Sequence, residues 1–384
     1  MTSQDPSSKL RVLIVGGGVA ALETALALRE LAPGLTDTTI LAPNSEFHYR
    51  AMAVREPFAY PRAQRYALAQ IAKDAGVALV SEELAWVEPD KQLVHTTAGA
   101  ELAYDVLVLA MGARISPRFQ HAITIDDSQL DETLHGLIQD IEEGYVASVA
   151  FVAPARMAWQ LPLYELALMT AARADDMNVE LATTIVTPED SPLAIFGLTA
   201  SAAVGELLEQ AKIKVITSGY VEVPRTGELV INPGDRHLKV DRVVALPELY
   251  GPEIRGVPLS EHGFLRVNEH CRLLEDEHIY AAGDATEFAV KHGGIASQQA
   301  DTVAQSIAAL AGAELTPEPF HPIIRGMLLT GEKPRYLTAR ITGGAGFSSE
   351  ISEQPTWSPP SKIAAKYLAP YLDSLDQAQA EAEA

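Results

Sequence analysis

Apolar runs that end in glycine turns, alternating with segments of helical periodicity, dominate this chain. The first run covers residues 12–15 and is continuous, which is typical of a β-strand buried on both faces. Residues 19–31 follow three glycines, and their apolar positions recur near a 3.6-residue period that predicts a helix. Repetition of such units predicts an α/β protein built on doubly wound parallel sheets.

The first glycine turn has a spacing that suits a pyrophosphate. Gly16, Gly18 and Ala21 stand at G-x-G-x-x-A positions. Gly16 allows a tight turn, Gly18 lets a phosphate approach the backbone, and Ala21 lets the helix pack closely on the strand. Val19 and Ala20 open the helix, whose N-terminus offers free N–H groups and partial positive charge. We therefore predict a dinucleotide site here; the alternative is a glycine turn in another kind of α/β protein.

The second strand, predicted over residues 38–41, lacks the acidic end residue that holds ribose hydroxyls in many nucleotide-binding units. Ala42 stands there instead. Asn44 could bond a ribose, although more weakly than a carboxylate, and Glu46 is a substitute candidate. An ordinary turn residue is an equally good interpretation of Asn44.

Two further apolar strands also end in glycine turns. One ends at Ala110, Met111 and Gly112, and the other at Gly283 and Asp284. Open α/β sheets bind ligands at the carboxyl ends of their strands, so Asp284 is a candidate ligand-binding group. The commoner role of such an aspartate is in a turn or a helix cap.

A helix predicted over residues 295–311 begins after Lys291, His292 and two glycines. Its N-terminus, at Gly294 and Ile295, can stabilise developing negative charge. Lys291 could stabilise a reduced cofactor or an anionic substrate, or be a solvated surface lysine. His292 could relay a proton near neutral pH, or be a histidine satisfied in the core.

Residues 116–254 repeat the strand–helix rhythm without the phosphate-binding turn. The segment after the strand predicted over residues 147–152 contains no glycine before the next helix. This argues against tight binding of a second dinucleotide in the usual way and leaves a looser mode open. Trp159, in that segment, is a candidate for the substrate side.

Composition narrows the class of protein. The chain has 384 residues, which predicts two or three domains, and its net charge of −22 argues against non-specific binding to nucleic acid or anionic membranes. No apolar run is long enough to span a bilayer, and the short polar segment before Lys9 does not resemble a signal peptide. Cys271 is the single cysteine, so no disulfide forms within the chain. We expect a cytoplasmic protein without a metal site.

The carboxyl-terminal residues suggest a docking helix followed by a tail. Residues 361–372 place apolar side chains on one helical face, which we expect to pack on its own domain or on a second subunit of a homodimer. Peripheral contact with the inner face of a membrane is the less favoured alternative, because basic residues are few. Residues 376–384 are acidic and alanine-rich, and we predict a disordered tail.

Three motifs together carry a family resemblance. They are VGGGVAALE at residues 15–23, LVLAMG at residues 107–112 and YAAGDAT at residues 280–286. In order and spacing they resemble the signatures of flavoproteins with two dinucleotide-binding domains, the pyridine nucleotide-disulfide oxidoreductase superfamily. Within it the chain is most similar to the group of sulfide:quinone oxidoreductases and type II NADH dehydrogenases.

The resemblance implies flavin adenine dinucleotide (FAD) and two Rossmann-like domains. The FAD-binding domain would be discontinuous, over residues 8–115 and 255–315, with a second nucleotide-type domain at 116–254 and a small region at 316–375. The residues implied in FAD binding are Gly16, Gly18, Val19, Ala20, Ala21, Asn44, Ala110, Met111, Gly112, Gly283, Asp284, Gly294 and Ile295. The candidates for the catalytic side are Lys291, His292 and Trp159.

Departures from the family limit the functional prediction. Sulfide:quinone oxidoreductases use cysteines near the flavin, but the residues just before Pro162 include no thiol, and type II NADH dehydrogenases carry a second glycine motif that is missing here. The resemblance still implies an FAD-dependent oxidoreductase that passes two electrons from NAD(P)H or another small reductant to a quinone-like acceptor. The alternatives are a sulfide:quinone-type flavoprotein lacking the cysteines and a flavin relay subunit without turnover of its own.

Overall fold

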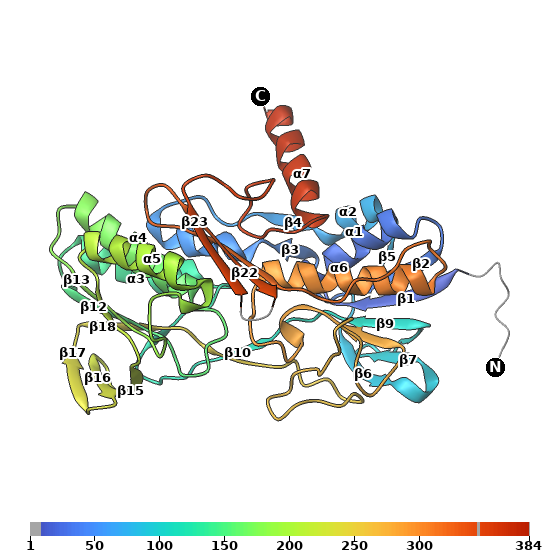
Figure 1. Cartoon of the computed structure of the whole chain (residues 1–384), viewed down its shortest axis with the longest axis horizontal. Helices are drawn as coiled ribbons and strands as arrows, with labels where there is room; N and C mark the ends of the chain where they lie inside the picture. Colours follow the sequence, from blue (N-terminus) through green and yellow to red (C-terminus); the bar gives the residue numbers. More distant parts are fainter. Residues whose placement is uncertain (1–8, 344–345, 384) are drawn as a thin grey trace.

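Two parallel five-stranded sheets form the framework, and the computed structural model describes them within residues 9–343 and 346–383. The first sheet has the order β20 (Ile279–Ala281), β9 (Val106–Leu109), β1 (Leu10–Val15), β2 (Thr36–Leu41) and β5 (Ala78–Val80). The second has the order β11 (Ile123–Thr124), β18 (Arg242–Ala245), β12 (Ser148–Val152), β13 (Ala182–Val186) and β14 (Lys214–Ile216). The two sheets lie along the long axis of the molecule (Figure 1). The predicted α/β class with two Rossmann-like units is confirmed.

The first sheet is covered by α1 (Val19–Leu31), α2 (Leu68–Ala75) and α6 (Gly293–Leu310). The apolar run of β1 is buried, as its pattern predicted. Helix α1 is buried over nine consecutive residues, 20–28, because it packs both on the sheet and against α6. The small side chains of Ala21, Ala25 and Ala27 allow these layers to come close.

The second sheet lies between helices and a small antiparallel sheet. Its helices are α3 (Leu130–Glu142), α4 (Leu161–Asp176) and α5 (Leu198–Gln210). On its other face packs a meander of β15 (Tyr220–Arg225), β16 (Glu228–Asn232) and β17 (Arg236–Lys239).

The chain crosses between the two sheets twice, and the two crossings pair with each other. They are the antiparallel strands β10 (Arg114–Ser116) and β19 (Glu248–Tyr250). The 3₁₀ helix η1 (Arg50–Phe58), which follows β2 in the first unit, contacts α3 and α4 of the second. Residues 50–58 are therefore structured where the two units meet.

The other elements that precede the carboxyl-terminal region are short. They are β3 (Glu46–His48), β4 (Arg65–Ala67), β6 (Leu84–Glu88), η2 (Pro89–Lys91), β7 (Leu93–Thr96), β8 (Glu101–Ala103), η3 (Ala194–Phe196) and η4 (Gly283–Ala285).

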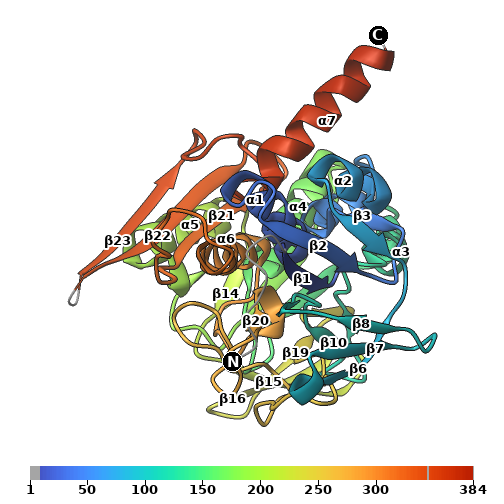
Figure 2. The same ribbon diagram turned by 90° about the vertical axis from the view of Figure 1, so that its right-hand side faces the viewer.

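The carboxyl-terminal region packs against both units. Strands β21 (Ile323–Leu328), β22 (Arg335–Gly343) and β23 (Gly346–Ser352) form an antiparallel sheet that packs on α4 and α5. Helix α7 (Leu368–Glu383) starts on α1 and projects away from the body in both views (Figures 1 and 2). The prediction of a disordered tail over residues 376–384 is wrong as far as Glu383, because α7 continues through this segment; residue 384, like residue 8 at the other end, lies outside the described residues. Alanine, glutamine and glutamate all have high helix propensity, which explains why this segment is helical and not disordered.

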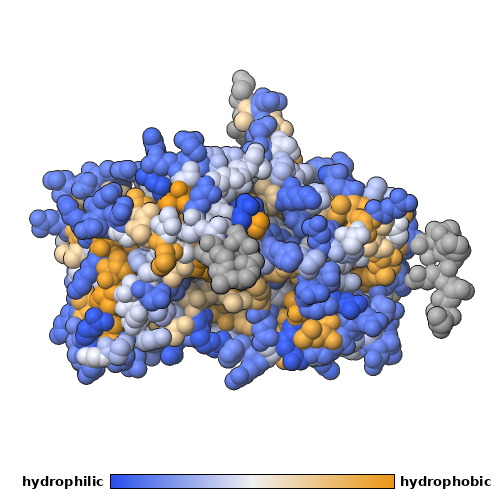
Figure 3. Space-filling view, in the orientation of Figure 1, coloured by the Kyte–Doolittle hydropathy of each residue, from blue (hydrophilic) through white to orange (hydrophobic). Residues whose placement is uncertain are grey.

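The surface of the molecule is mainly hydrophilic on the face seen in Figure 3, where apolar residues form separate patches. In the described part of the chain, no helix combines the length and the apolar character needed to cross a membrane.

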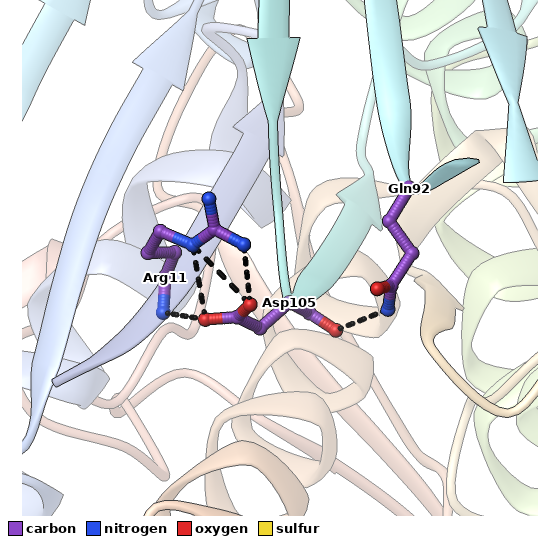
Figure 4. Close-up of polar contacts among 3 residues, drawn as sticks. All are labelled: Arg11, Gln92 and Asp105. Carbon is purple, nitrogen blue, oxygen red and sulfur yellow. Dashed lines mark hydrogen bonds and ion pairs between the residues drawn. The ribbon is translucent and has the colours of Figure 1, made fainter. Parts of the chain in front are cut away.

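An ion pair fixes the amino-terminal ends of the two central strands. Arg11 in β1 binds Asp105, which directly precedes β9, through its backbone N–H (2.8 Å) and its guanidinium (2.6 Å), and Gln92 donates to the carbonyl of Asp105 (Figure 4). The hydrogen bonds from Arg11 lower the pKa of Asp105. The pair sets the register of Val12 against Val106 and leaves the carboxyl ends of both strands free for a site.

A buried carboxylate holds the start of α7 against α1. Glu23 is fully buried and accepts hydrogen bonds from the backbone N–H groups of Lys366 (2.7 Å), Tyr367 (2.9 Å) and Leu368 (2.5 Å). A negative charge at a helix N-terminus is favourable, so this side chain both caps and docks the helix. Asp301 of α6 lies beside Glu23, and burial, with the charge of Glu23, raises the pKa of Asp301 to about 8.

We expect Asp301→Asn to flatten the pH dependence of stability. The raised pKa means that the folded protein holds a proton at Asp301 that the unfolded chain releases, so the free energy of unfolding falls as pH rises from about 4 to about 8. The slope from this group is at most about 1.4 kcal/mol per pH unit. Urea unfolding across this range measures it, with the exposed Asp90→Asn as control. An equal slope in wild type and Asp301→Asn would contradict the assignment.

Candidate functional site

The carboxyl ends of β1 and β9 approach each other so closely that one position must be glycine. Ala110 N–H donates to the carbonyl of Val15 (2.8 Å), and Gly16 N–H donates to Leu41 (2.9 Å). A Cβ on Gly16 would lie 2.7 Å from the carbonyl carbon of Ala110, and its φ of +129° is one that other residues rarely adopt. Backbone packing alone therefore requires Gly16.

Gly18 and Gly112 face open space at the same edge. No atom lies within 4 Å of a Cβ built on either residue, and Gly18 caps α1 without a side-chain hydrogen bond. The first-turn N–H groups, including those of Val19 and Ala20, have no acceptor within the helix. An open cradle at a bare helix N-terminus fits a pyrophosphate, which brings negative oxygens to those N–H groups.

The turn after β20 closes the edge between α1 and α6. A Cβ on Gly283 would lie 3.3 Å from Ala20 Cβ and 3.2 Å from Ala296 Cβ, and the N–H of Gly283 donates to Gln299 Oε1 (2.7 Å). Asp284 follows at once, and burial raises its pKa to about 6 while the nearby charge of Lys291 opposes that shift. The three glycine-marked strand ends thus meet along one edge of the sheet.

Lys291 is buried, which overturns the interpretation of a solvated surface lysine. It is 6% exposed, donates to the carbonyl of Thr286, and lies 4.1 Å from the centroid of the Phe264 ring. Burial lowers the pKa of Lys291 to about 8, against the opposing charges of Asp284 and Glu287.

His292 caps α6 and occupies the N–H groups that we assigned to a cofactor. Its Nδ1 accepts from Gly294 N–H (3.0 Å), and its backbone carbonyl accepts from the N–H groups of Ile295 and Ala296, both at 3.0 Å. Burial lowers the pKa of His292 to about 3, so the ring is neutral at pH 7 and is not poised to relay a proton there. A Cβ on Gly294 would lie 2.8 Å from His292 Cε1, which explains the glycine at this position.

Trp159 reaches the same place from the second unit. Its ring stacks on His292 with centroids 4.2 Å apart and meets Phe196 edge-on at 5.7 Å. All three catalytic candidates therefore lie near the start of α6, although Trp159 is more than a hundred residues away in sequence.

The other residues predicted for the site differ in how exposed they are. Asn44 is exposed just beyond β2, whereas Glu46 pairs with Arg65 (3.7 Å) and is already engaged. Ala110 and Ile295 are buried, and Met111 is half-buried.

At the corresponding edge of the second sheet, side chains bond to one another. Eight residues, 153–160, separate β12 from α4, against three between β1 and α1. Tyr164 donates to Glu189 Oε2 (2.8 Å), and Thr187 donates to Gln160 Oε1 (2.7 Å). Ala194 N–H donates to the other oxygen of Glu189 (3.1 Å), whose pKa is raised by burial. These groups lie at the carboxyl ends of β12 and β13, the edge where open α/β sheets bind ligands, and their polar atoms are engaged with one another.

Sequence reasoning missed two buried contacts, each of which joins one unit to the carboxyl-terminal segment. Glu165 of α4 pairs with Lys362, which also donates to the carbonyl of Met327 (3.0 Å), and Tyr49 accepts from Ile363 N–H (2.9 Å). A glutamate in an otherwise apolar helix was the available signal for the first contact.

Cys271 is unsuited to nucleophilic chemistry. The thiol is buried, which raises the pKa of Cys271 to about 12 and makes it a poor nucleophile. Within residues 9–343 and 346–383, no group of three or more histidine, cysteine or carboxylate side chains could hold a metal ion.

Comparisons with known proteins agree with this arrangement. An NADH dehydrogenase-like protein of Mycobacterium tuberculosis is 27% identical over 302 residues, covering 71% of this chain and 72% of that protein. A sulfide-quinone reductase of Aquifex aeolicus is 31% identical over 111 residues, covering 27% of this chain and 24% of that one.

Solved structures share the fold at low identity. The sulfide:quinone oxidoreductase from the hyperthermophilic bacterium Aquifex aeolicus superposes with a TM-score of 0.78 at 18% identity, covering 90% of this chain and 87% of that one. A ferredoxin reductase from Rhodopseudomonas palustris gives 0.67 at 18%, covering 89% and 88%, and NDH2 from Plasmodium falciparum gives 0.58 at 16%, covering 73% and 64%.

The family is shown by a match over most of the chain. The sequence profile of the pyridine nucleotide-disulphide oxidoreductases matches residues 2–139 and 165–303. The family resemblance drawn from the three motifs is confirmed, and this chain belongs to the pyridine nucleotide-disulphide oxidoreductase family as an FAD-dependent oxidoreductase.

Proposed function

We propose that this protein takes two electrons from a small reductant and delivers them through FAD to a quinone-like acceptor. The observation that carries the proposal is the meeting of three glycine-marked strand ends and the N-terminus of α6 along one sheet edge. When bound, FAD supplies two-electron transfer at N5 of its ring system. The acceptor class rests on likeness to relatives described as sulfide-quinone reductase and sulfide:quinone oxidoreductase.

The chain's own residues have distinct parts in this proposal. Gly18, Val19 and Ala20 receive the pyrophosphate, and Gly112 leaves room for it. Asp284 hydrogen-bonds the ribityl chain of the cofactor, next to the pyrophosphate. The other residues proposed to contact the cofactor are Gly16, Ala21, Asn44, Ala110, Met111 and Gly283. Gly294 and Ile295 line the start of α6, but their N–H groups are bonded to His292 and do not donate to the cofactor.

Lys291, His292 and Trp159 are proposed to border the reacting ring. Lys291 brings a positive charge near Asp284, and His292 and Trp159 form a stacked wall between the two units. Such a wall excludes water from the ring and limits access to flat, small molecules.

The identity of the electron donor is the next part of the proposal. NAD(P)H is one candidate, since an NADH dehydrogenase-like protein is among the relatives. In the second unit, however, Tyr164 and Glu189 fill the end of β13, and the segment before α4 is lengthened. We therefore favour a small reductant that reaches the flavin without this crevice, although a looser mode of dinucleotide binding is compatible with the fold.

Location and assembly are further parts of the proposal. We place the protein in the cytoplasm and propose that α7 contacts a second subunit; contact with the inner face of a membrane is the less favoured alternative. The outer part of α7, residues 377–383, carries glutamates and no cation, so attraction to anionic lipids is not its role.

Substitution of Gly18 and Gly16 by alanine separates cofactor binding from folding. Gly18→Ala meets nothing in the protein, so we expect apo stability to be unchanged and FAD affinity to fall at least about tenfold. Gly16→Ala would clash with Ala110, so we expect it to lower the free energy of unfolding by about 2 kcal/mol or more. Urea unfolding of apo protein and flavin fluorescence titration measure both. Full FAD affinity in Gly18→Ala would contradict the pyrophosphate assignment.

A donor and acceptor screen tests the reaction. The purified flavoprotein is mixed anaerobically with NADH, NADPH, sulfide and small thiols, and the flavin absorbance is followed. We expect NADH and NADPH to reduce it at least about tenfold more slowly than the best small reductant. Protein reduced with dithionite should then be reoxidised by a short-chain quinone. Saturable, rapid reduction by NADH would contradict our preference of donor, and no reoxidation would contradict the acceptor.

A further inference from the structure

We propose that His292 presents its Nε2–H as a hydrogen-bond donor to a carbonyl oxygen of a flat, conjugated ring bound at the start of α6. The proposal rests on the proposed function, because that function brings such rings to this edge. It assigns to one side chain the task that the backbone N–H groups of Gly294 and Ile295 were expected to perform.

The tautomer of His292 follows from its capping bond. Gly294 N–H donates to Nδ1 at 3.0 Å, and a nitrogen that accepts such a bond carries a lone pair and no proton. The ring is neutral, so its one N–H must be at Nε2. Nε2 is thus the ring nitrogen that takes no part in the capping bond.

This Nε2–H lacks a partner among the residues that the structure describes, although the atom is buried. A buried donor without an acceptor is destabilising, and most such donors in native proteins bind another group. Lys291, the neighbouring residue, is turned to the Thr286 carbonyl and the Phe264 ring and offers no acceptor here. The missing acceptor is therefore expected to belong to a ligand.

The backbone cannot take over this role. Gly294 N–H is bound to Nδ1, and Ile295 N–H to the carbonyl of His292. The first of these bonds instead links the helix N-terminus to the imidazole, so that the partial positive charge of α6 polarises Nε2–H. The stack on Trp159 at 4.2 Å, with planes 26° apart, fixes the ring in this orientation.

Chemistry limits the ligand to a carbonyl acceptor on a flat ring. A single neutral N–H donor suits a carbonyl oxygen, and the adjacent Trp159 offers an apolar wall for a planar group. Two sources share this chemistry: the pyrimidine edge of FAD and a quinone. The experiment below separates them.

The test uses a substitution that keeps the cap and removes the donor. Asparagine caps helices well, so in His292→Asn its side-chain oxygen can accept from Gly294 N–H while nothing reaches the ligand. Exposed His321→Asn is the matched control. Urea unfolding of the apo proteins should show that His292→Asn is more stable than His292→Ala, because only asparagine keeps the cap.

If the acceptor is FAD, His292→Asn weakens FAD binding at least about tenfold and shifts the flavin absorption bands. If it is the quinone, FAD binding and spectrum are unchanged, while KM for a short-chain quinone rises about tenfold with kcat nearly constant. Wild-type FAD affinity, flavin spectrum and quinone KM in His292→Asn would overturn the proposal.

Nitrogen-15 NMR of histidine-labelled full-length protein gives a readout independent of turnover. We expect the Nε2–H tautomer of His292 in the apo protein, and a downfield shift of that proton when FAD or the quinone is added. The Nδ1–H tautomer, or no shift with either compound, would overturn the proposal. Protein that binds no FAD but shifts this proton with quinone would refute the proposed cofactor site and leave this donor supported.

Discussion

The close approach of two strand ends governs the rest of this structure. Gly16 at the end of β1 lies against the carbonyl of Ala110 at the end of β9, closer than any side chain would allow. Their other ends are held by Arg11 and Asp105, so the register between the strands is fixed at both ends. With the strands in place, the first turn of α1, the Gly283 turn and the start of α6 can only meet at one edge.

The second unit has the same architecture but lacks a glycine turn like that of Gly16. There the segment between β12 and α4 is five residues longer than the segment between β1 and α1, and it contains no glycine. It therefore lacks the glycine turn that suits a phosphate in the first unit. Instead it sends Trp159 across to stack on His292, while Tyr164 and Glu189 close the strand ends behind it. In our proposal, the second unit thus contributes a wall to the site of the first unit through Trp159.

Local signals in the sequence were enough to predict the framework. Buried strands read as continuous apolar runs, and the glycine turns marked the carboxyl ends that form the site, because both depend on residues close together in the chain. The family match confirms the resulting family and class of enzyme.

What sequence reasoning missed depends on distant contacts. The burial of Lys291 follows from Phe264 and Asp284, and the neutral state of His292 from its burial at the interface of the two units. The helical tail was missed because composition was weighed above helix propensity, and the docking of α7 depends on Glu23, more than three hundred residues earlier. The hydrophobic periodicity of a sequence does not reveal contacts between residues that are far apart in the chain.

The most direct test of the account is the amount of flavin bound per chain. Purified protein, saturated with FAD, freed of excess and then denatured, should release a single FAD for each polypeptide, because one edge is open and the other is closed by its own side chains. A colourless protein that retains no FAD would contradict the site at the first sheet. Release of two would contradict the closure of the second.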